Sequence, residues 1–411
     1  MDPKTNHTAT ASEEPNRRKR NILFKLVAIA IGILVGLAAT EVGLRLVERV
    51  RLGDRAGGAT IPDSKLGTRM VPNTGGQDAN GFRNASVRSH VDIVALGDSQ
   101  TWGVNVQSID AWPQQLERLS GLSVYNMGVG GYGPVHYWIL DSQALSFSPR
   151  AVVVGLYLGN DIYDAYALAY ANDNYVELRT NPEIKVDTIK DKVGRYWDEE
   201  KNFHQTYGRN SPMGWSFWLR EHSAIGRLLN RNGLWPGATD VDYEIDKAWV
   251  HAYPDDGAVC EDQNIRTVFP TAYRAAGLDL SDPRIVEGLR LTKEVLLRTN
   301  QQTNQAGARL LVLMIPTKET VYAGVMQQDG KVSGNYARLV DLESSVRQDL
   351  TAWCAQQRIE CVDALPNLRA AIESRKQLYP STTESHPNAT GYAVIAATVA
   401  EALRNNPGSR R

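Results

Sequence analysis

The sequence has few of the residues that build disulfide-rich or metal-dependent domains. Its 411 residues include only three cysteines and seven histidines, and no two cysteines form a Cys-x-x-Cys pair. This count excludes a disulfide scaffold, a zinc ribbon and a thioredoxin-like site. No P-loop is present, and the glycine-rich run at 128–133 lacks the later acidic residue that would support dinucleotide binding. We therefore expect no metal and no cofactor.

The chain also lacks an excess of charge of either sign. Lys and Arg number 45 against 46 Asp and Glu, which leaves a net charge of −1. This balance gives no support for a nucleic-acid footprint over the whole chain, so we expect no nucleic-acid partner. Hydrophobic residues at 42% and charged residues at 22% are close to the averages for globular proteins. The chain can therefore bury a sizeable core.

One long hydrophobic run lies near the N-terminus. Residues 22–39 read ILFKLVAIAIGILVGLAA, and Lys25 is the one charge among them. A helix of that length rises about 27 Å, which is near the minimum needed to cross the core of a bilayer. The apolar pattern continues to Val47. The segment 22–47 is therefore predicted to be a transmembrane helix whose partner is the lipid bilayer.

The same segment is open to two interpretations. The small residues of Gly36-Leu37-Ala38 fit the cleavage site of a signal peptide, but the continuing helix pattern favours an uncleaved signal anchor. The basic cluster at 17–20 precedes the run. Its position favours a cytoplasmic N-terminus and a catalytic domain outside the cytoplasm, in the periplasm or at the cell surface.

Short apolar runs alternate with amphipathic stretches from residue 91 onward. Five runs are predicted to be strands: 91–96, 122–127, 151–158, 308–316 and 359–364. Helices are predicted near 110–120, 134–147, 283–305, 337–357 and 388–404. This alternation predicts an α/β fold, a three-layer α/β/α sandwich with a five-stranded, mostly parallel sheet.

Changes in composition divide the chain into seven segments. A core in two parts is separated by a long stretch rich in Tyr, Trp, Asn and Asp, which we expect to be an irregular insert. The predicted segments are a cytoplasmic tail (1–21), the anchor (22–47), a stalk and entry segment (48–90), the first part of the core (91–164), the insert (165–282), the second part of the core (283–405) and a tail (406–411).

Polar residues and glycines follow the predicted strands, at the edge where ligands bind in such sheets. Ser99 follows the first strand, Gly131 the second and Asn160 the third. His386 precedes the last helix and lies two residues after Glu384. A serine can act as a nucleophile, a histidine as its base, and backbone or carboxamide N–H groups as oxyanion donors. Each residue taken alone also fits an ordinary turn or surface loop.

Taken together and in this order, the four residues resemble the four blocks of the SGNH (GDSL-type) hydrolase family. The resemblance covers about 90–160 and 285–404 and implies the flavodoxin-like SGNH fold after the N-terminal transmembrane helix. It implies that Ser99 is the nucleophile and His386 the base. It also implies an oxyanion hole made by Gly131, Asn160 and the N–H of Ser99.

One position departs from the family pattern. Family members commonly carry Asp three residues before the histidine, whereas this chain has Thr383 there. Glu384 lies two residues before His386, a spacing that membrane-anchored relatives often fill with Asp. We therefore expect Glu384 to orient His386. The alternatives are a Ser–His dyad and, last, a role for the hydroxyl of Thr383.

Two further stretches are similar to membrane-anchored SGNH proteins and to alginate and cell-wall O-acetyltransferases. They are Leu96–Gly103, which reads LGDSQTWG, and Pro316-Thr317-Lys318-Glu319. Asp98 and Lys318, which lie in them, are expected to bind substrate. For Lys318 a solvated loop position is an equal alternative.

The resemblance implies a serine-dependent hydrolase of acyl esters, in our interpretation acetyl esters of an extracytoplasmic glycan, acting through an acyl-enzyme on Ser99. An O-acetyltransferase that uses the same acyl-enzyme is one alternative. A non-catalytic glycan-binding protein on a degenerate core is another. If the domain lies outside the cytoplasm, we also expect a disulfide between Cys354 and Cys361.

Overall fold

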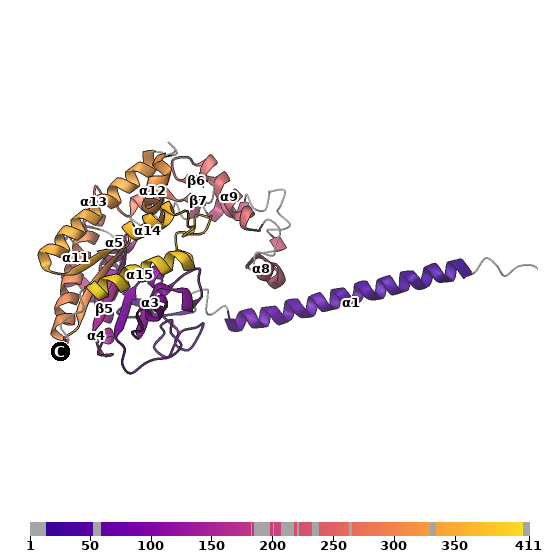
Figure 1. Cartoon of the computed structure of the whole chain (residues 1–411), viewed down its shortest axis with the longest axis horizontal. Coiled ribbons are helices and arrows are strands. Elements are labelled where there is room, and N and C mark those ends of the chain that lie inside the picture. Colours follow the sequence, from indigo (N-terminus) through magenta and orange to yellow (C-terminus); the bar gives the residue numbers. More distant parts are fainter. Residues whose placement is uncertain are drawn as a thin grey trace, which may run out of the picture. The chain divides into compact units, whose positions relative to one another are not determined.

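The computed structural model divides into two compact units (Figure 1). One unit contains residues 1–50 and 218–236, and the other contains 51–217 and 237–411. The structure describes residues 14–51, 59–181, 183–184, 198–199, 201–206, 218–219, 222–231, 238–262, 265–328 and 334–405.

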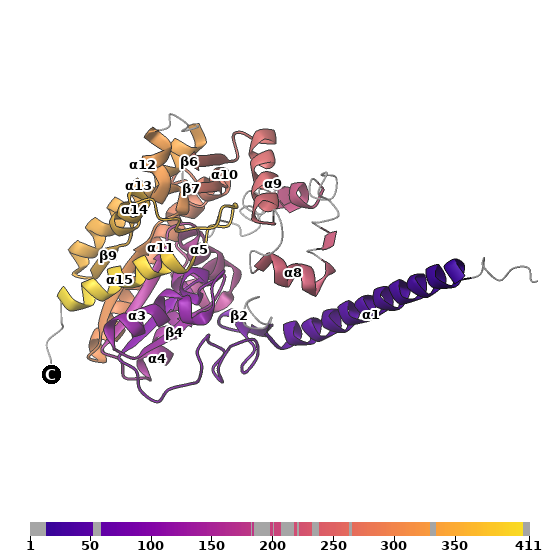
Figure 2. The same ribbon diagram turned by 45° about the vertical axis from the view of Figure 1, so that its right-hand side comes forward.

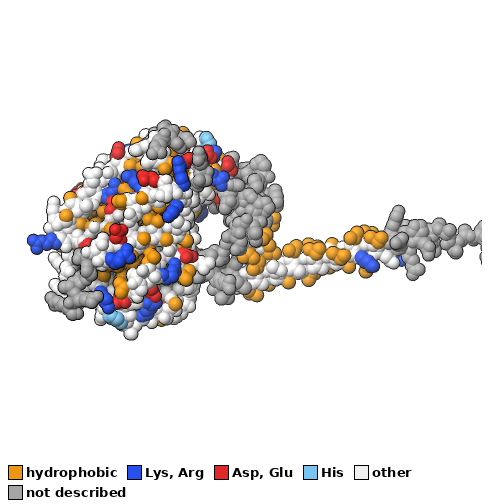
Figure 3. Space-filling view, in the orientation of Figure 1, with side chains coloured by type: hydrophobic (Ala, Val, Ile, Leu, Met, Phe, Trp, Pro, Cys, Tyr) orange, Lys and Arg blue, Asp and Glu red, His pale blue; other side chains and the backbone are white. Residues whose placement is uncertain are grey.

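The first unit is built on the N-terminal helix α1 (Glu14–Arg51). The span 20–46 within it contains an 18-residue window with a mean hydropathy of 2.6 and no buried residue, so the helix is long and apolar enough to cross a membrane. Hydrophobic side chains run along its length (Figure 3). Glu41, a carboxylate in this apolar helix, accepts hydrogen bonds from the N–H groups of Ala224 (2.8 Å) and Ile225 (3.0 Å). It therefore caps the positive end of helix α8 (Ala224–Arg231).

The second unit is centred on a five-stranded parallel sheet. The strands are β3 (Ile93–Gly97), β4 (Val124–Gly128), β5 (Ala151–Tyr157), β8 (Arg309–Ile315) and β9 (Glu360–Asp363), in the order β4-β3-β5-β8-β9. Each neighbouring pair is parallel. The predicted sheet and its five strand positions are confirmed.

Helices cover both faces of this sheet. Alternate residues of one strand enter different clusters: Ile93 and Ala95 pack on one face, and Val94 and Leu96 on the other. The first face is covered by α3 (Trp112–Ser120), α12 (Lys318–Gln328), α14 (Leu365–Glu373) and α15 (Ala389–Asn405). The second face is covered by α4 (Pro134–Leu145), α11 (Pro283–Gln305) and α13 (Gly334–Gln357). Burial on both faces explains why the strands are nearly continuous apolar runs.

The stretch from 165 to 282 is not irregular throughout, which corrects our expectation. Its described part contains the end of α5 (Asp161–Ala171), a 3-10 turn η3 (Asp173–Leu178), α9 (Ala238–Ala252), the hairpin β6 (Ala258–Asp262) and β7 (Ile265–Phe269), and α10 (Thr271–Ala276). Figure 2 shows α9 beside this hairpin. Sequence reasoning missed α9 because charged residues interrupt its apolar face. The boundaries of the insert stay a prediction.

The remaining short elements lie before and within the first part of the core. Strands β1 (Thr60–Asp63) and β2 (Gly67–Met70) form an antiparallel hairpin in the entry segment. The 3-10 turn η2 (Ser108–Asp110) precedes α3. The short helix α2 (Ser99–Trp102) follows β3 directly and carries the predicted nucleophile.

Three glycines let α2 lie directly on the sheet. Gly97 pairs in register with Gly128 on one side and with Gly155 on the other. A Cβ atom added at Gly97 would lie 2.0 Å from Thr101 Oγ1, and one at Gly155 would lie 2.6 Å from the same atom. A Cβ atom at Gly128 would lie 2.7 Å from the carbonyl carbon of Thr101. Side chains at these positions would therefore push α2 off the sheet.

Candidate active site

Ser99 begins α2 at the carboxyl end of β3. The residue before it, Asp98, caps this helix by accepting a hydrogen bond of 2.8 Å from the N–H of Gln100. Ser99 is half-buried and lines a cavity, so its hydroxyl is accessible to a small molecule. The turn and the cap together fix the direction of the Ser99 side chain.

The loop before α15 places His386 against Ser99. His386 Nε2 lies 2.8 Å from Ser99 Oγ. On its other side, His386 Nδ1 is hydrogen-bonded to the carboxylate of Glu384. The backbone N–H of His386 also donates to that carboxylate, at 3.0 Å. The three side chains therefore have the geometry of a nucleophile, a base and an acid that orients the base.

Glu384 is held as a carboxylate. Burial by itself would raise the pKa of Glu384, but hydrogen bonds from the ring and backbone of His386, the charge of His386 and a hydrogen bond from Asn105 lower that pKa to about 2. An ionised carboxylate at Nδ1 keeps the proton on that nitrogen, so Nε2 can accept the proton of Ser99.

Thr383 has a different contact. Its backbone N–H donates to Asp246 Oδ2 of α9 at 2.6 Å. No described hydrogen bond joins its hydroxyl to His386.

Asn160 and Gly131 follow the two strands that flank β3. Asn160 is the N-cap of α5, and its Nδ2 donates to Asp164 Oδ2 at 2.6 Å. A carboxamide nitrogen has two hydrogens, so this bond leaves one for a ligand in the cavity that Asn160 and Ser99 both line.

Gly131 is exposed, with a φ of +79°, in the turn after β4. The turn passes close to the nucleophile, because a Cβ added at the neighbouring Gly130 would lie 3.8 Å from the Cβ of Ser99. Among the described residues, no hydrogen bond uses the N–H of Gly131. Gly131 is not among the residues that line the cavity.

A cavity of about 410 Å³ opens over these side chains. Residues of the core line it, including Ser99, Asn160 and His386. Residues of the predicted insert line it too, including His204, Asp246 and Arg274. The volume suits one small ester or one sugar unit. No group of three or more His, Cys, Asp or Glu side chains within the described ranges is placed to hold a metal.

Arg274 of α10 joins the two loops of the site, and sequence reasoning did not find it. Its Nη1 donates to the carbonyl of Gly159 at 3.2 Å, and its Nη2 donates to the hydroxyl of Ser385. These are the residues directly before Asn160 and His386. Burial alone would lower the pKa of Arg274, but neighbouring tyrosines and carboxylates raise it. The buried guanidinium therefore stays charged. No motif marks this arginine in the sequence.

Lys318 does not have either of its expected positions, which is a correction. It is fully buried at the start of α12 and does not line the cavity. Its Nζ donates to the carbonyls of Thr382 (2.6 Å), Glu384 (3.1 Å) and Val268 (3.0 Å). Burial lowers the pKa of Lys318 to about 8. The lysine therefore holds the loop of His386 by hydrogen bonds to its carbonyls, away from the cavity.

Asp98, which we also expected to bind substrate, is fully buried beneath α2 and does not line the cavity. Burial raises the pKa of this carboxyl group. Its Oδ2 accepts a hydrogen bond of 3.3 Å from Ser99 Oγ. Asp98 is therefore a cap and a support for Ser99.

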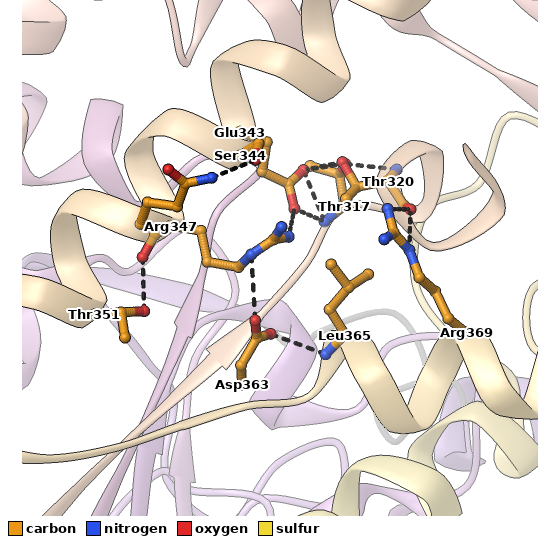
Figure 4. A network of polar contacts seen from close by, with 10 residues as sticks. Thr317, Thr320, Glu343, Ser344, Arg347, Thr351, Asp363, Leu365 and Arg369 are labelled. Atoms are coloured by element: carbon orange, nitrogen blue, oxygen red, sulfur yellow. Dashed lines mark hydrogen bonds and ion pairs between the residues drawn. The ribbon is translucent and has the colours of Figure 1, made fainter. Parts of the chain in front are cut away.

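A buried network that includes Thr317 and Glu343 holds the turn after β8 (Figure 4). Lys318 follows this turn as the first residue of α12. Glu343 of α13 accepts hydrogen bonds from the hydroxyls of Thr317 and Thr320, the latter at 2.7 Å. Burial raises the pKa of Glu343 to about 7. Arg347 lies 3.2 Å from Asp363, which ties the network to β9. The network therefore fixes the start of α12, and with it Lys318.

Comparison with known families gives one match. Residues 279–411 match the family model of the SGNH hydrolase-like domain of the acetyltransferase AlgX. This part of the chain is about a third of its length and contains β8, β9, α15 and the loop of His386. It does not contain Ser99. None of the curated proteins matches the chain.

Several solved structures have a distant likeness to the chain. An extracellular lipase from Streptomyces rimosus is 12% identical, with 76% of this chain and 98% of the lipase covered and a TM-score of 0.35. A protein described as a lipolytic protein of the G-D-S-L family from Desulfitobacterium hafniense is 11% identical, with 76% and 98% covered and a TM-score of 0.35. Because these likenesses are distant, only the family-model match at 279–411 is used in the argument below.

Proposed function

We propose that the chain, whose residues 279–411 match an SGNH hydrolase-like domain, removes or transfers acetyl groups through an acyl-enzyme on Ser99. The observation that carries this proposal is the hydrogen-bonded row Ser99–His386–Glu384, which opens on a cavity of about 410 Å³. A polar row of this kind, beside a cavity of this size, is suited to acyl transfer.

The first half of the reaction forms the acyl-enzyme. Ser99 Oγ attacks the carbonyl carbon of the ester while its proton passes to His386 Nε2. The carboxylate of Glu384 stabilises the imidazolium that results. Asn160 and the N–H groups of Gly131 and Ser99 stabilise the oxyanion. The alcohol of the ester then leaves with the proton from His386.

The second half releases the acyl group. An acceptor hydroxyl attacks the acyl carbonyl, His386 takes its proton, and the bond to Ser99 Oγ breaks as Ser99 regains a proton. Water as the acceptor gives a hydrolase, and a sugar hydroxyl gives an O-acetyltransferase. The description of the matching family model as that of an acetyltransferase favours the second reaction.

The proposed substrate is an O-acetylated glycan outside the cytoplasm. The support is the apolar helix 20–46, with the basic cluster before it, and the family-model match. In this proposal 22–47 is retained as an anchor and holds the catalytic domain at the membrane.

A fluorophosphonate probe tests the nucleophile. The full chain in detergent should be labelled once, Ser99→Ala should not be labelled, and Ser345→Ala, a change at an exposed serine of α13, should be labelled as wild type is. Turnover of p-nitrophenyl acetate should follow the same pattern. Folded wild-type protein that takes no label at several pH values would instead favour a non-catalytic glycan-binding protein. Addition of an acetylated glycan and an acceptor glycan then separates hydrolysis from transfer.

A further inference from the structure

A second histidine–carboxylate pair lines the same cavity as the serine row. His204 Nε2 lies 2.5 Å from Asp246 Oδ1. Asp246 belongs to α9 and its side chain is fully buried, whereas 27% of the His204 side chain is exposed. Both residues line the cavity with Ser99 and His386. The exposed member of the pair is therefore the imidazole.

Asp246 is held in place from two sides. Its Oδ1 faces His204, and its Oδ2 accepts the N–H of Thr383 at 2.6 Å. Thr383 precedes Glu384 in the loop that carries His386. The pair is therefore fastened to the backbone of the catalytic loop, although His204 and Asp246 come from the predicted insert. The contact between Asp246 Oδ1 and His204 Nε2 does not have hydrogen-bond geometry, so the carboxylate restricts the position of the imidazole by contact and charge.

The size of the cavity limits what the pair can contact. The serine row and the pair line the same cavity of about 410 Å³, which is small for a ligand site, so an acceptor bound there can lie beside both. The reaction on Ser99 needs a second hydroxyl compound, the acceptor, beside the acyl group. The serine row occupies one part of the lining, and the imidazole of His204 belongs to another.

We propose that His204, positioned by Asp246, binds the acceptor hydroxyl compound that attacks the acyl group on Ser99. This inference rests on the proposed function and adds to it a site for the acceptor. The acceptor oxygen forms the new bond to the acyl carbon, its proton passes to His386 Nε2, the bond from that carbon to Ser99 Oγ breaks, and His386 returns the proton to Ser99. His204 holds the acceptor and neither gains nor loses a proton overall.

An acceptor site affects deacylation and leaves acylation unchanged, so the test measures the two steps separately. We would measure acylation as kcat/KM for p-nitrophenyl acetate. The lifetime of the acetyl-enzyme would be followed by rapid quench and intact-mass spectrometry, with and without methyl glucoside as the acceptor. His204→Gln should keep kcat/KM within about twofold and lengthen the lifetime about tenfold or more, since one hydrogen bond to the acceptor is lost. The effect should be largest with methyl glucoside present.

Two variants separate binding of the acceptor from support of the fold. His204→Lys places a positive charge opposite Asp246, and should retain the long lifetime because the ammonium does not reproduce the imidazole edge. His251→Gln, at an exposed histidine at the end of α9, should behave as wild type. A lifetime unchanged in His204→Gln would overturn the proposal. An equal slowing of acylation and of deacylation in His204→Gln that His204→Lys reverses would also overturn it. That result would show that His204 only supplies a positive charge that supports the fold beside Asp246.

Failure of the proposed function gives a different result. If wild type forms no acetyl-enzyme and Ser99→Ala changes nothing, the acyl-enzyme mechanism is wrong, and the acceptor site falls with it. If wild type forms an acetyl-enzyme whose lifetime is independent of His204, only the acceptor site is wrong.

Discussion

His386 Nε2 lies 2.8 Å from Ser99 Oγ, although 287 positions separate the two residues in the chain. The contact depends on the loop before α15, and two buried cations hold that loop. Lys318 binds its carbonyls, and Arg274 binds Ser385 within it. The distance between Ser99 and His386 is therefore set by residues that do not belong to the row itself.

Glu384 should be the acid of the row. We expect Glu384→Gln to fold normally and to lose kcat on p-nitrophenyl acetate by about 10²- to 10⁴-fold, since an amide cannot stabilise the imidazolium and favours the wrong tautomer. Thr383→Ala is the matched control and should cost little, because the hydrogen bond described for Thr383 is made by its backbone N–H, which alanine keeps. Near-normal turnover of Glu384→Gln would indicate a Ser–His dyad.

Arg274 should act as a positioning residue. Its two nitrogens reach Gly159 and Ser385 together, a fork that one ammonium cannot reproduce. Arg274→Lys should therefore lower kcat about tenfold with little change in KM. Arg274→Ala should be partly rescued by added guanidinium ion. Arg298→Lys, at a half-exposed arginine of α11, is the control. Full activity of Arg274→Lys would show that a positive charge is enough.

Glu343 should make stability depend on pH. Its pKa is raised from 4.5 to about 7 in the folded protein, so the folded state binds more protons than the unfolded state between these values. The contribution of this group is full below about pH 4.5 and is lost as the pH rises through 7.

The matched variant is Glu343→Gln, which is neutral at every pH. Its free energy of unfolding relative to wild type should rise by about 3 kcal/mol from pH 4 to pH 8, since each pKa unit corresponds to about 1.4 kcal/mol. Urea unfolding of the two proteins at both pH values checks this. A difference that does not change with pH would contradict it.

Cys354 and Cys361 should form a disulfide under oxidising conditions. Both are thiols in the structure, and they belong to the same hydrophobic cluster at the corner between α13 and β9. Mass spectrometry of unreduced peptides from exported protein should show the pair joined and Cys260, which is buried in β6, unmodified. Recovery of Cys354 and Cys361 as free thiols from such protein would contradict the prediction.

The fold was predictable because its signal is local. Each strand of the sheet is buried on both faces, so it appears in the sequence as an unbroken apolar run such as 151–157. Ser99, Asn160 and His386 were predictable because each lies at the end of a strand or the start of a helix. Their distances to one another were not, since they depend on how distant segments pack.

The sequence could not place the residues that support the site. Lys318 was expected in solvent or on substrate because lysine is seldom buried, and its burial depends on carbonyls from two separate segments, β7 and the loop before α15. Arg274, His204 and Asp246 come from a stretch with no regular apolar period. Contacts between residues 137 positions apart, such as Thr383 with Asp246, leave no trace in local spacing.

The absence of side chains at the glycines beneath α2 determines how close Ser99 lies to the sheet. Gly97, Gly128 and Gly155 lie side by side on three neighbouring strands, and α2 packs directly on their backbone. This packing determines the position of Ser99. A single methyl group there would lift α2, and a shift of about 1 Å is enough to take an oxygen and a nitrogen out of hydrogen-bond range. Alanine at any of these three positions should therefore abolish the proposed activity, although every polar residue of the site would be unchanged.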